Sequence, residues 1–94
     1  MSRYNVKRRS SVEAFQVQTD DNEAGWPEWA KLARAKHEDE AGAIILRPIL
    51  PGYLIETYQG RIIVEPGDWI IRNDIGEITG CKDETFKQTF EPEE

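Results

Sequence analysis

The sequence predicts an α+β domain, with a mainly antiparallel sheet of about five strands, one main helix and a short C-terminal helical turn. Three observations lead to this expectation. A helical period is present where Trp29, Leu32 and Ala33 recur at i, i+3 and i+4. Short β-branched and aromatic runs follow over residues 43–79, separated by turn formers. These runs are joined by short turns, which favours antiparallel pairing of consecutive strands.

The first strand is expected over residues 11–17, where apolar and polar residues are interleaved. A loop over 19–25 separates it from the helix. The helix is expected to begin at Pro27. Proline has no backbone N–H, and an N–H at the first helical position would have no partner within the helix anyway. The acidic run 38–42 is expected to end the helix in an exposed turn.

Two turns organise the strands that follow the short apolar run 43–46. Gln59-Gly60 is predicted to close a hairpin, since glycine accepts a positive φ without steric cost. Pro66-Gly67-Asp68 is predicted to turn the chain again, because proline presets φ at the first corner and glycine frees the second.

The last elements are a strand over 69–72, a turn at 73–76 and a returning strand at 77–79. Asp83 is then expected to cap a helical turn that places Phe86 and Phe90 on one face.

Size and composition predict one domain over residues 1–94, with 1–10 and 91–94 frayed at its ends. The single cysteine forms no internal disulfide, which favours a cytoplasmic setting. The longest apolar run, 43–50, is far too short to span a bilayer and is broken by Arg47. A net charge of −6 disfavours nonspecific binding to nucleic acid, which depends on basic surface.

Short motifs occur near both ends of the chain. A basic stretch from Tyr4 to Ser10 leads into Val-Glu-Ala-Phe-Gln at 12–16. Toward the end come Pro-Gly-Asp-Trp-Ile at 66–70, Gly76-Glu77, Cys81-Lys82, Phe86 and Phe90-Glu91. Over about half of the chain, this combination resembles a family of small proteins encoded by tailed bacteriophages and prophages.

The chain departs from that family's pattern at Gly80 and Asp83, since the family commonly has a proline on either side of the Cys-Lys pair. These changes alter turn chemistry more than any recognisable site. The resemblance implies a phage or prophage origin and action inside the bacterial cell, and it implies no particular activity.

Residues with catalytic or metal-binding chemistry are few. Cys81 is the only thiol and His37 the only imidazole, and a cysteine nucleophile needs a base beside it. One histidine and one cysteine do not fill a structural zinc site, and the acidic run 38–40 lacks the spacing of a calcium loop. No glycine-rich phosphate loop is present. We therefore expect no catalytic residue, metal or cofactor.

The leading functional hypothesis is a non-enzymatic accessory protein that binds a bacterial or phage protein. Its candidate contact residues are Trp26, Trp69, Arg72 and the basic pair Arg8 and Arg9. This acidic chain has a basic start and an acidic end, a separation of charge that can steer a partner.

The alternative is a module that binds nucleotides or single-stranded nucleic acid by stacking bases on Tyr53, Tyr58 and Trp69 beside Arg72. An enzyme that uses Cys81 and a structural component of the virion are further hypotheses. Oligomeric state does not follow from the sequence.

Overall fold

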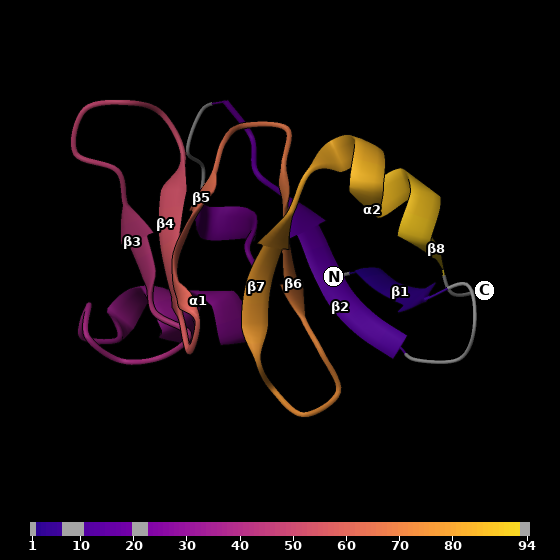
Figure 1. Cartoon of the computed structure of the whole chain (residues 1–94), viewed down its shortest axis with the longest axis horizontal. Coiled ribbons are helices and arrows are strands. Elements are labelled where there is room, and N and C mark those ends of the chain that lie inside the picture. Colours follow the sequence, from indigo (N-terminus) through magenta and orange to yellow (C-terminus); the bar gives the residue numbers. More distant parts are fainter. Residues whose placement is uncertain (1, 7–10, 20–22, 93–94) are drawn as a thin grey trace.

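The computed structural model describes residues 2–6, 11–19 and 23–92 (Figure 1). The strands are β1 (Ser2–Val6), β2 (Ser11–Gln16), β3 (Ile44–Leu46), β4 (Tyr53–Thr57), β5 (Gly60–Val64), β6 (Trp69–Arg72), β7 (Ile78–Cys81) and β8 (Phe90–Pro92). The helices are α1 (Glu28–Ala35) and α2 (Asp83–Thr89), preceded by a 3-10 turn, η1 (Glu23–Gly25). The predicted α+β class is confirmed.

The strands are divided between two antiparallel sheets, so the prediction of a single sheet of about five strands is wrong. One sheet has the order β7-β6-β2-β1-β8 and the other, called here the small sheet, has the order β3-β4-β5. The break falls at the turn between β5 and β6. There Val17 donates to the carbonyl of Asp68 (2.8 Å) and accepts from the amide of Gly67 (2.9 Å), so the chain leaves the turn beside β2 rather than beside β5.

The turn itself is as predicted. The Asp68 amide donates to the Glu65 carbonyl at 2.9 Å, and Gly67 has a φ of +94° at the second corner. The predicted hairpin is also present, but its two-residue loop is Tyr58-Gln59, one residue earlier than expected. Gly60 begins β5 with a φ of +116°, so it supplies the positive φ from the first strand position.

The main core lies between α1, the inner face of the small sheet and one face of the larger sheet. Its buried members are Val17, Trp26, Ala30, Ala33, Ile44, Tyr53, Ile55, Val64, Ile70 and Ile78. The two alanines of α1 allow the helix to approach the sheet closely. Leu32, expected on the buried face, is instead 60% exposed, because α1 contacts the core through Ala30 and Ala33.

A second cluster fills the other face of the larger sheet. Val12, Ala14 and Ile71 pack there against Phe86 of α2. Phe86 also approaches Phe90, with ring centroids 4.9 Å apart, but Phe90 begins β8 instead of sharing a helical face with Phe86 as predicted. The larger sheet is therefore covered on both sides, by the main core and by α2 (Figure 1).

Several boundaries differ from the sequence expectation. Pro27 precedes the first helical residue, Glu28, and α1 ends at Ala35, before the acidic run 38–42. That run forms a separate turn, in which the Glu40 amide donates to the His37 carbonyl at 2.9 Å. In the segments expected to fray, β1 pairs with β2 and β8, while residues 1, 7–10 and 93–94 lie outside the described residues.

Candidate functional site: a groove between two turns

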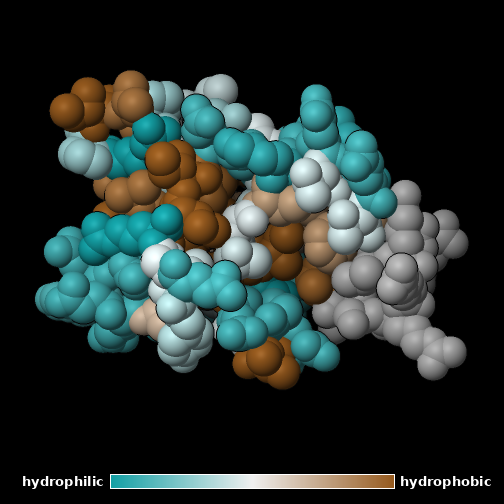
Figure 2. Space-filling model, viewed as in Figure 1, coloured by the Kyte–Doolittle hydropathy of each residue, from teal (hydrophilic) through white to brown (hydrophobic). Residues whose placement is uncertain are grey.

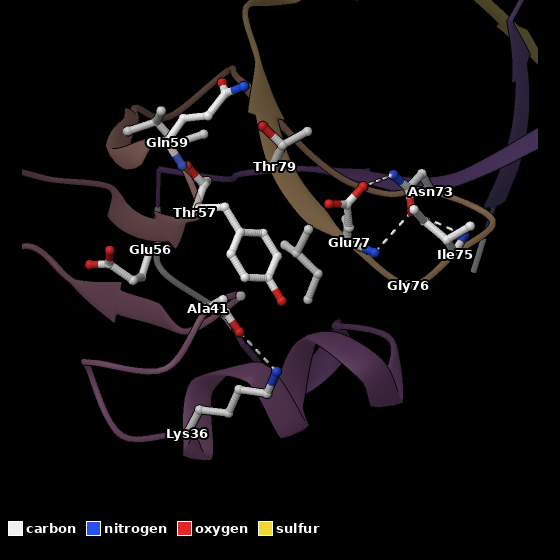
Figure 3. Close-up of a pocket in the computed structure, with 14 residues that line it drawn as sticks. Lys36, Ala41, Glu56, Thr57, Gln59, Asn73, Ile75, Gly76, Glu77 and Thr79 are labelled. Carbon is white, nitrogen blue, oxygen red and sulfur yellow. Dashed lines mark hydrogen bonds between the residues drawn. The ribbon is translucent and has the colours of Figure 1, made fainter.

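A groove with a volume of about 560 Å³ lies between the tip of the β4–β5 hairpin and the β6–β7 turn (Figure 3). One wall contains Thr57 and Gln59, and the opposite wall contains Asn73 and Glu77. The end of α1 and the chain after it close one side. The groove therefore joins three segments that are distant in the sequence.

The β4–β5 turn is held by the side chain of Thr57. Its hydroxyl donates to the Gly60 carbonyl at 2.6 Å and accepts from the Gln59 amide at 3.2 Å. Tyr58 lies in the two-residue loop of this hairpin and is 84% exposed. The hairpin thus places an aromatic ring at the rim of the groove.

The opposing β6–β7 turn is organised by Asn73. Its Oδ1 accepts from the amides of Ile75 (3.1 Å) and Glu77 (2.9 Å), and its Nδ2 donates to a Glu77 carboxylate oxygen at 3.0 Å. Gly76 completes the turn with a φ of +91°. As a result, Ile75 is held at the tip of the turn and is 76% exposed.

The third side of the groove contains Lys36 and the segment around Ala41 and Gly42. The Lys36 ammonium donates to the Ala41 carbonyl at 3.2 Å, which fixes the side chain against its own loop (Figure 3). Ile62 and Ile78, which also belong to the core, provide apolar lining. The groove therefore combines apolar lining with polar walls.

Carboxylates dominate the charge of this region. Glu56 lines the groove and bonds to Arg61 at 2.7 Å, an interaction that raises the pKa of the guanidinium. The carboxylates of Glu38 and Asp39 also raise the pKa of Arg61 through space, so the acidic turn after α1 lies close to this pair.

Next to the groove, the outer face of the small sheet carries a row of apolar side chains beside the Glu56–Arg61 pair. Ile45, Leu54 and Ile63 are direct cross-strand neighbours on the face that points away from the core, and Ile63 is 55% exposed. Figure 2 shows this hydrophobic area on the face turned to the viewer, while α1 lies on the opposite side of the small sheet (Figure 1). We call these three side chains the outer row.

The motif residues converge on a different place. Trp69 stacks on Phe86 with ring centroids 3.9 Å apart and rings inclined by 4°. Its indole N–H donates to Asp83 Oδ1 at 2.9 Å, and Gln16 reaches the Gly67 carbonyl at 2.8 Å. Motifs from both ends of the chain therefore form one polar network beside α2.

Two further motif residues complete this network. Asp68 is buried, accepts from the Glu65 amide at 3.0 Å and pairs with Lys82 at 2.9 Å. The hydrogen bond to Asp68 raises the pKa of Lys82, with a further contribution from Glu65. Since these contacts hold the β5–β6 turn and attach it to the start of α2, the motif has a structural explanation.

Asp83 does not have the capping role predicted from the sequence. Lys82 occupies the cap position without a side-chain cap hydrogen bond, and Asp83 is the first helical residue. Its carboxylate is held instead by the Trp69 indole and by Lys87 at 3.0 Å, and these two interactions lower the pKa of Asp83.

The residues proposed from the sequence as partner contacts are not assembled into one surface. Trp26 is buried in the main core, where its ring lies 5.0 Å from that of Tyr53. Trp69 belongs to the network beside α2, and Arg72 lies 3.7 Å from a Glu13 carboxylate oxygen. Arg8 and Arg9 lie outside the described residues.

The stacking platform suggested for nucleic acid is not assembled either. Tyr53 is fully buried and donates its hydroxyl to Glu23 at 2.8 Å, and Trp69 is stacked on Phe86. Of the three aromatic residues considered, Tyr58 alone presents an open ring. The hairpin and the turn at 73–76 were both predicted from the sequence, with Tyr58 just before the predicted hairpin loop, but that the two turns face each other was not predicted.

Cys81 packs against the second cluster, and burial raises the pKa of its thiol, with Asp68 adding to the effect. His37 lies on the turn after α1, where its Nδ1 is 3.5 Å from an Asp39 carboxylate oxygen.

In the described part of the chain, no three His, Cys, Asp or Glu residues are grouped to hold a metal ion. No described helix is long and apolar enough to cross a membrane.

Comparison of the chain with protein-family models, with curated proteins and with solved structures gives no match in any of the three. The candidate site therefore rests on the geometry of the chain itself.

Proposed function

We propose that the chain is a phage or prophage accessory protein that binds another protein in the cytoplasm of the bacterial cell and has no enzymatic activity. The observation that supports this most is the outer row of Ile45, Leu54 and Ile63 on the small sheet. Contiguous apolar side chains on a surface are a common feature of protein interfaces. The phage origin rests on the motif resemblance alone.

The groove extends the proposed surface beyond the outer row. Glu56 belongs to the outer face of β4 and also lines the groove, so the two features are contiguous. Tyr58 and Ile75 add exposed side chains of types that anchor partners at interfaces. A partner that covers both features excludes water from the apolar side chains, which is the main favourable contribution to such binding.

The chemistry of Cys81 supports a role without catalysis. Burial and the nearby carboxylate of Asp68 raise the pKa of its thiol, which disfavours the thiolate that a cysteine nucleophile requires. We therefore assign Cys81 to the packing of the second cluster.

A capture experiment with matched variants tests the proposal. Tagged wild-type protein, Ile63→Thr and Leu32→Thr are incubated with a lysate of the bacterium that carries the gene. Ile63 and Leu32 are exposed to a similar degree, 55% and 60%, but Leu32 lies on α1. The proposal predicts a partner that wild type and Leu32→Thr retain and Ile63→Thr loses, with the same order of affinities for the purified partner.

Two outcomes of the capture experiment would contradict the proposal. A partner retained equally by both variants contradicts the assignment of the outer row. Failure to enrich any protein over an unrelated tagged control, with and without induction of the phage genes, contradicts the protein-binding function.

A further inference from the structure

The rim of the groove carries two exposed apolar side chains on opposing turns. Tyr58 lies on the β4–β5 hairpin and Ile75 on the β6–β7 turn, and both line the same groove. Each turn is braced by internal hydrogen bonds, from Thr57 on one side and Asn73 on the other. The backbone of both turns is thus ordered before any ligand arrives, which reduces the backbone entropy lost on binding.

The charges around the groove are mostly negative. Glu56 and Glu77 line it, and the exposed acidic turn 38–40 directly precedes the lining residue Ala41. Lys36, whose charge is not neutralised by its bond to the Ala41 carbonyl, and Arg61, which pairs with Glu56, offset two of these five carboxylates. The region therefore presents an excess of negative charge to an incoming ligand.

We propose that the groove binds an extended basic segment of the partner protein. An apolar side chain of that segment lies between Tyr58 and Ile75, and its Lys or Arg residues face Glu77 and the acidic turn 38–40. An arginine placed over the exposed ring of Tyr58 gains a cation–π contact in addition. This inference rests on the proposed protein-binding function and specifies the partner's chemistry.

Two other occupants fit the charges less well. A nucleotide or nucleic-acid strand brings phosphates next to the acidic turn, where like charges repel. A second copy of this chain brings another net charge of −6 to the same surface. A basic segment is the occupant that the carboxylates favour.

The test uses selection followed by matched variants. A display library of random short peptides is selected against wild-type protein, and the affinities of the recovered peptides are measured by fluorescence polarisation. The proposal predicts peptides rich in Lys and Arg that also contain a large apolar residue. Their affinity falls as salt is raised from about 50 to about 300 mM, because screening weakens exposed ion pairs.

The variants separate the contribution of the acidic turn to binding from that of the Tyr58 ring. Glu38→Gln with Glu40→Gln is expected to weaken binding by about threefold to tenfold, and Tyr58→Ser by about tenfold. Glu28→Gln with Glu84→Gln removes the same formal charge from exposed positions on α1 and α2, and Leu32→Ser removes an exposed apolar side chain elsewhere. Both controls are expected to bind as wild type does.

Several outcomes overturn the inference. They are the absence of binders, recovered peptides without an excess of Lys and Arg, and affinities that the groove variants leave unchanged. Stabilisation by a nucleotide or oligonucleotide that Tyr58→Ser abolishes assigns the groove to that ligand instead. Self-association that Tyr58→Ser abolishes, seen by sedimentation, assigns it to a second copy.

Failure here is distinguishable from failure of the proposed function. If the lysate partner is still captured through Ile63 while no basic peptide binds the groove, the partner docks on the outer row alone. If neither experiment gives a binder, both proposals fall together.

Discussion

Substitution of Gly80 by alanine tests the place where the two sheets meet. A Cβ at this position lies 2.6 Å from Cγ2 of Val64 and 3.4 Å from Cδ1 of Ile62. Packed carbon atoms are about 3.5–4.0 Å apart, so Val64 and the added methyl group have to separate by about 1 Å. Val64 is only 1% exposed and its branched side chain has few rotamers to choose from, so the strain is not easily relieved.

Overpacking of this kind costs about 1–3 kcal/mol. For a domain of this size, each kcal/mol lowers the melting temperature by about 4–8 °C. We therefore expect Gly80→Ala to unfold at least about 4 °C below wild type in thermal denaturation followed by circular dichroism. Gly25→Ala is the matched control, because nothing lies within 4 Å of a Cβ there.

A double-mutant cycle attributes the cost to the contact with Val64. Val64→Ala alone removes buried methyl groups and costs about 1.5–2.5 kcal/mol. In the double variant the clash is gone, so the two costs should sum to at least about 1 kcal/mol more than the measured loss. Strict additivity, or a Gly80→Ala protein as stable as wild type, would refute the reasoning that the sheets meet at this contact.

Three further predictions concern single sites. The Trp69 indole and Lys87 lower the pKa of Asp83 in the folded state, so the stability it contributes is present above its unfolded pKa of about 3.9 and is lost as pH falls through the lower folded value. The urea midpoint of Asp83→Asn should therefore fall less than that of wild type below about pH 4, and parallel curves would contradict this role. Because burial raises its pKa, Cys81 should react with a thiol reagent at pH about 8 more slowly than free cysteine, and an equal rate would place it in solvent. Gly52→Ala should destabilise more than Gly60→Ala in urea titrations, since both have positive φ but a Cβ at Gly52 also meets the Val64 backbone; equal losses would show that φ alone decides.

Local features of the fold could be predicted from the sequence. The turn at Pro66-Gly67 depends on the φ preferences of two adjacent residues, and the structure has it where it was predicted. The hairpin at 58–60 was displaced by one residue, because glycine accepts a positive φ in the loop and also at the first strand position. Phe86 and Phe90 meet because Phe90 follows α2 directly, four residues after Phe86.

Features that depend on distant segments could not be predicted. The division into two sheets is decided by backbone hydrogen bonds between Val17 and the turn at 67–68. No pattern in the neighbouring sequence predicts these hydrogen bonds. Periodicity predicted Trp29, Leu32 and Ala33 on one face of α1; Ala33 is buried and Trp29 packs against the core, but Leu32 is exposed and Ala30 is buried in addition. The period of apolar residues therefore predicts where a helix lies more reliably than it predicts which face of the helix is buried.

The candidate site was missed for the same reason. Ile75 lies on a turn that was predicted and Tyr58 directly precedes the predicted hairpin loop, yet only the tertiary structure places them on one groove. Trp26 was selected as a contact residue because tryptophan is common at interfaces, but here it fills the core beside Tyr53. A run such as Tyr58-Gln59-Gly60, with a large side chain in a tight turn, is the local signal that marks an exposed aromatic residue.

Site-specific photocrosslinking in living cells tests the central claim of a protein partner on this surface most directly. Tyr58 is replaced by p-benzoylphenylalanine in one variant and Leu32 in another, since both side chains are well exposed but only Tyr58 borders the groove. If a protein partner occupies the groove, we expect one discrete protein adduct at position 58 on irradiation and none at position 32. No adduct at position 58, or the same adducts at both positions, would contradict it.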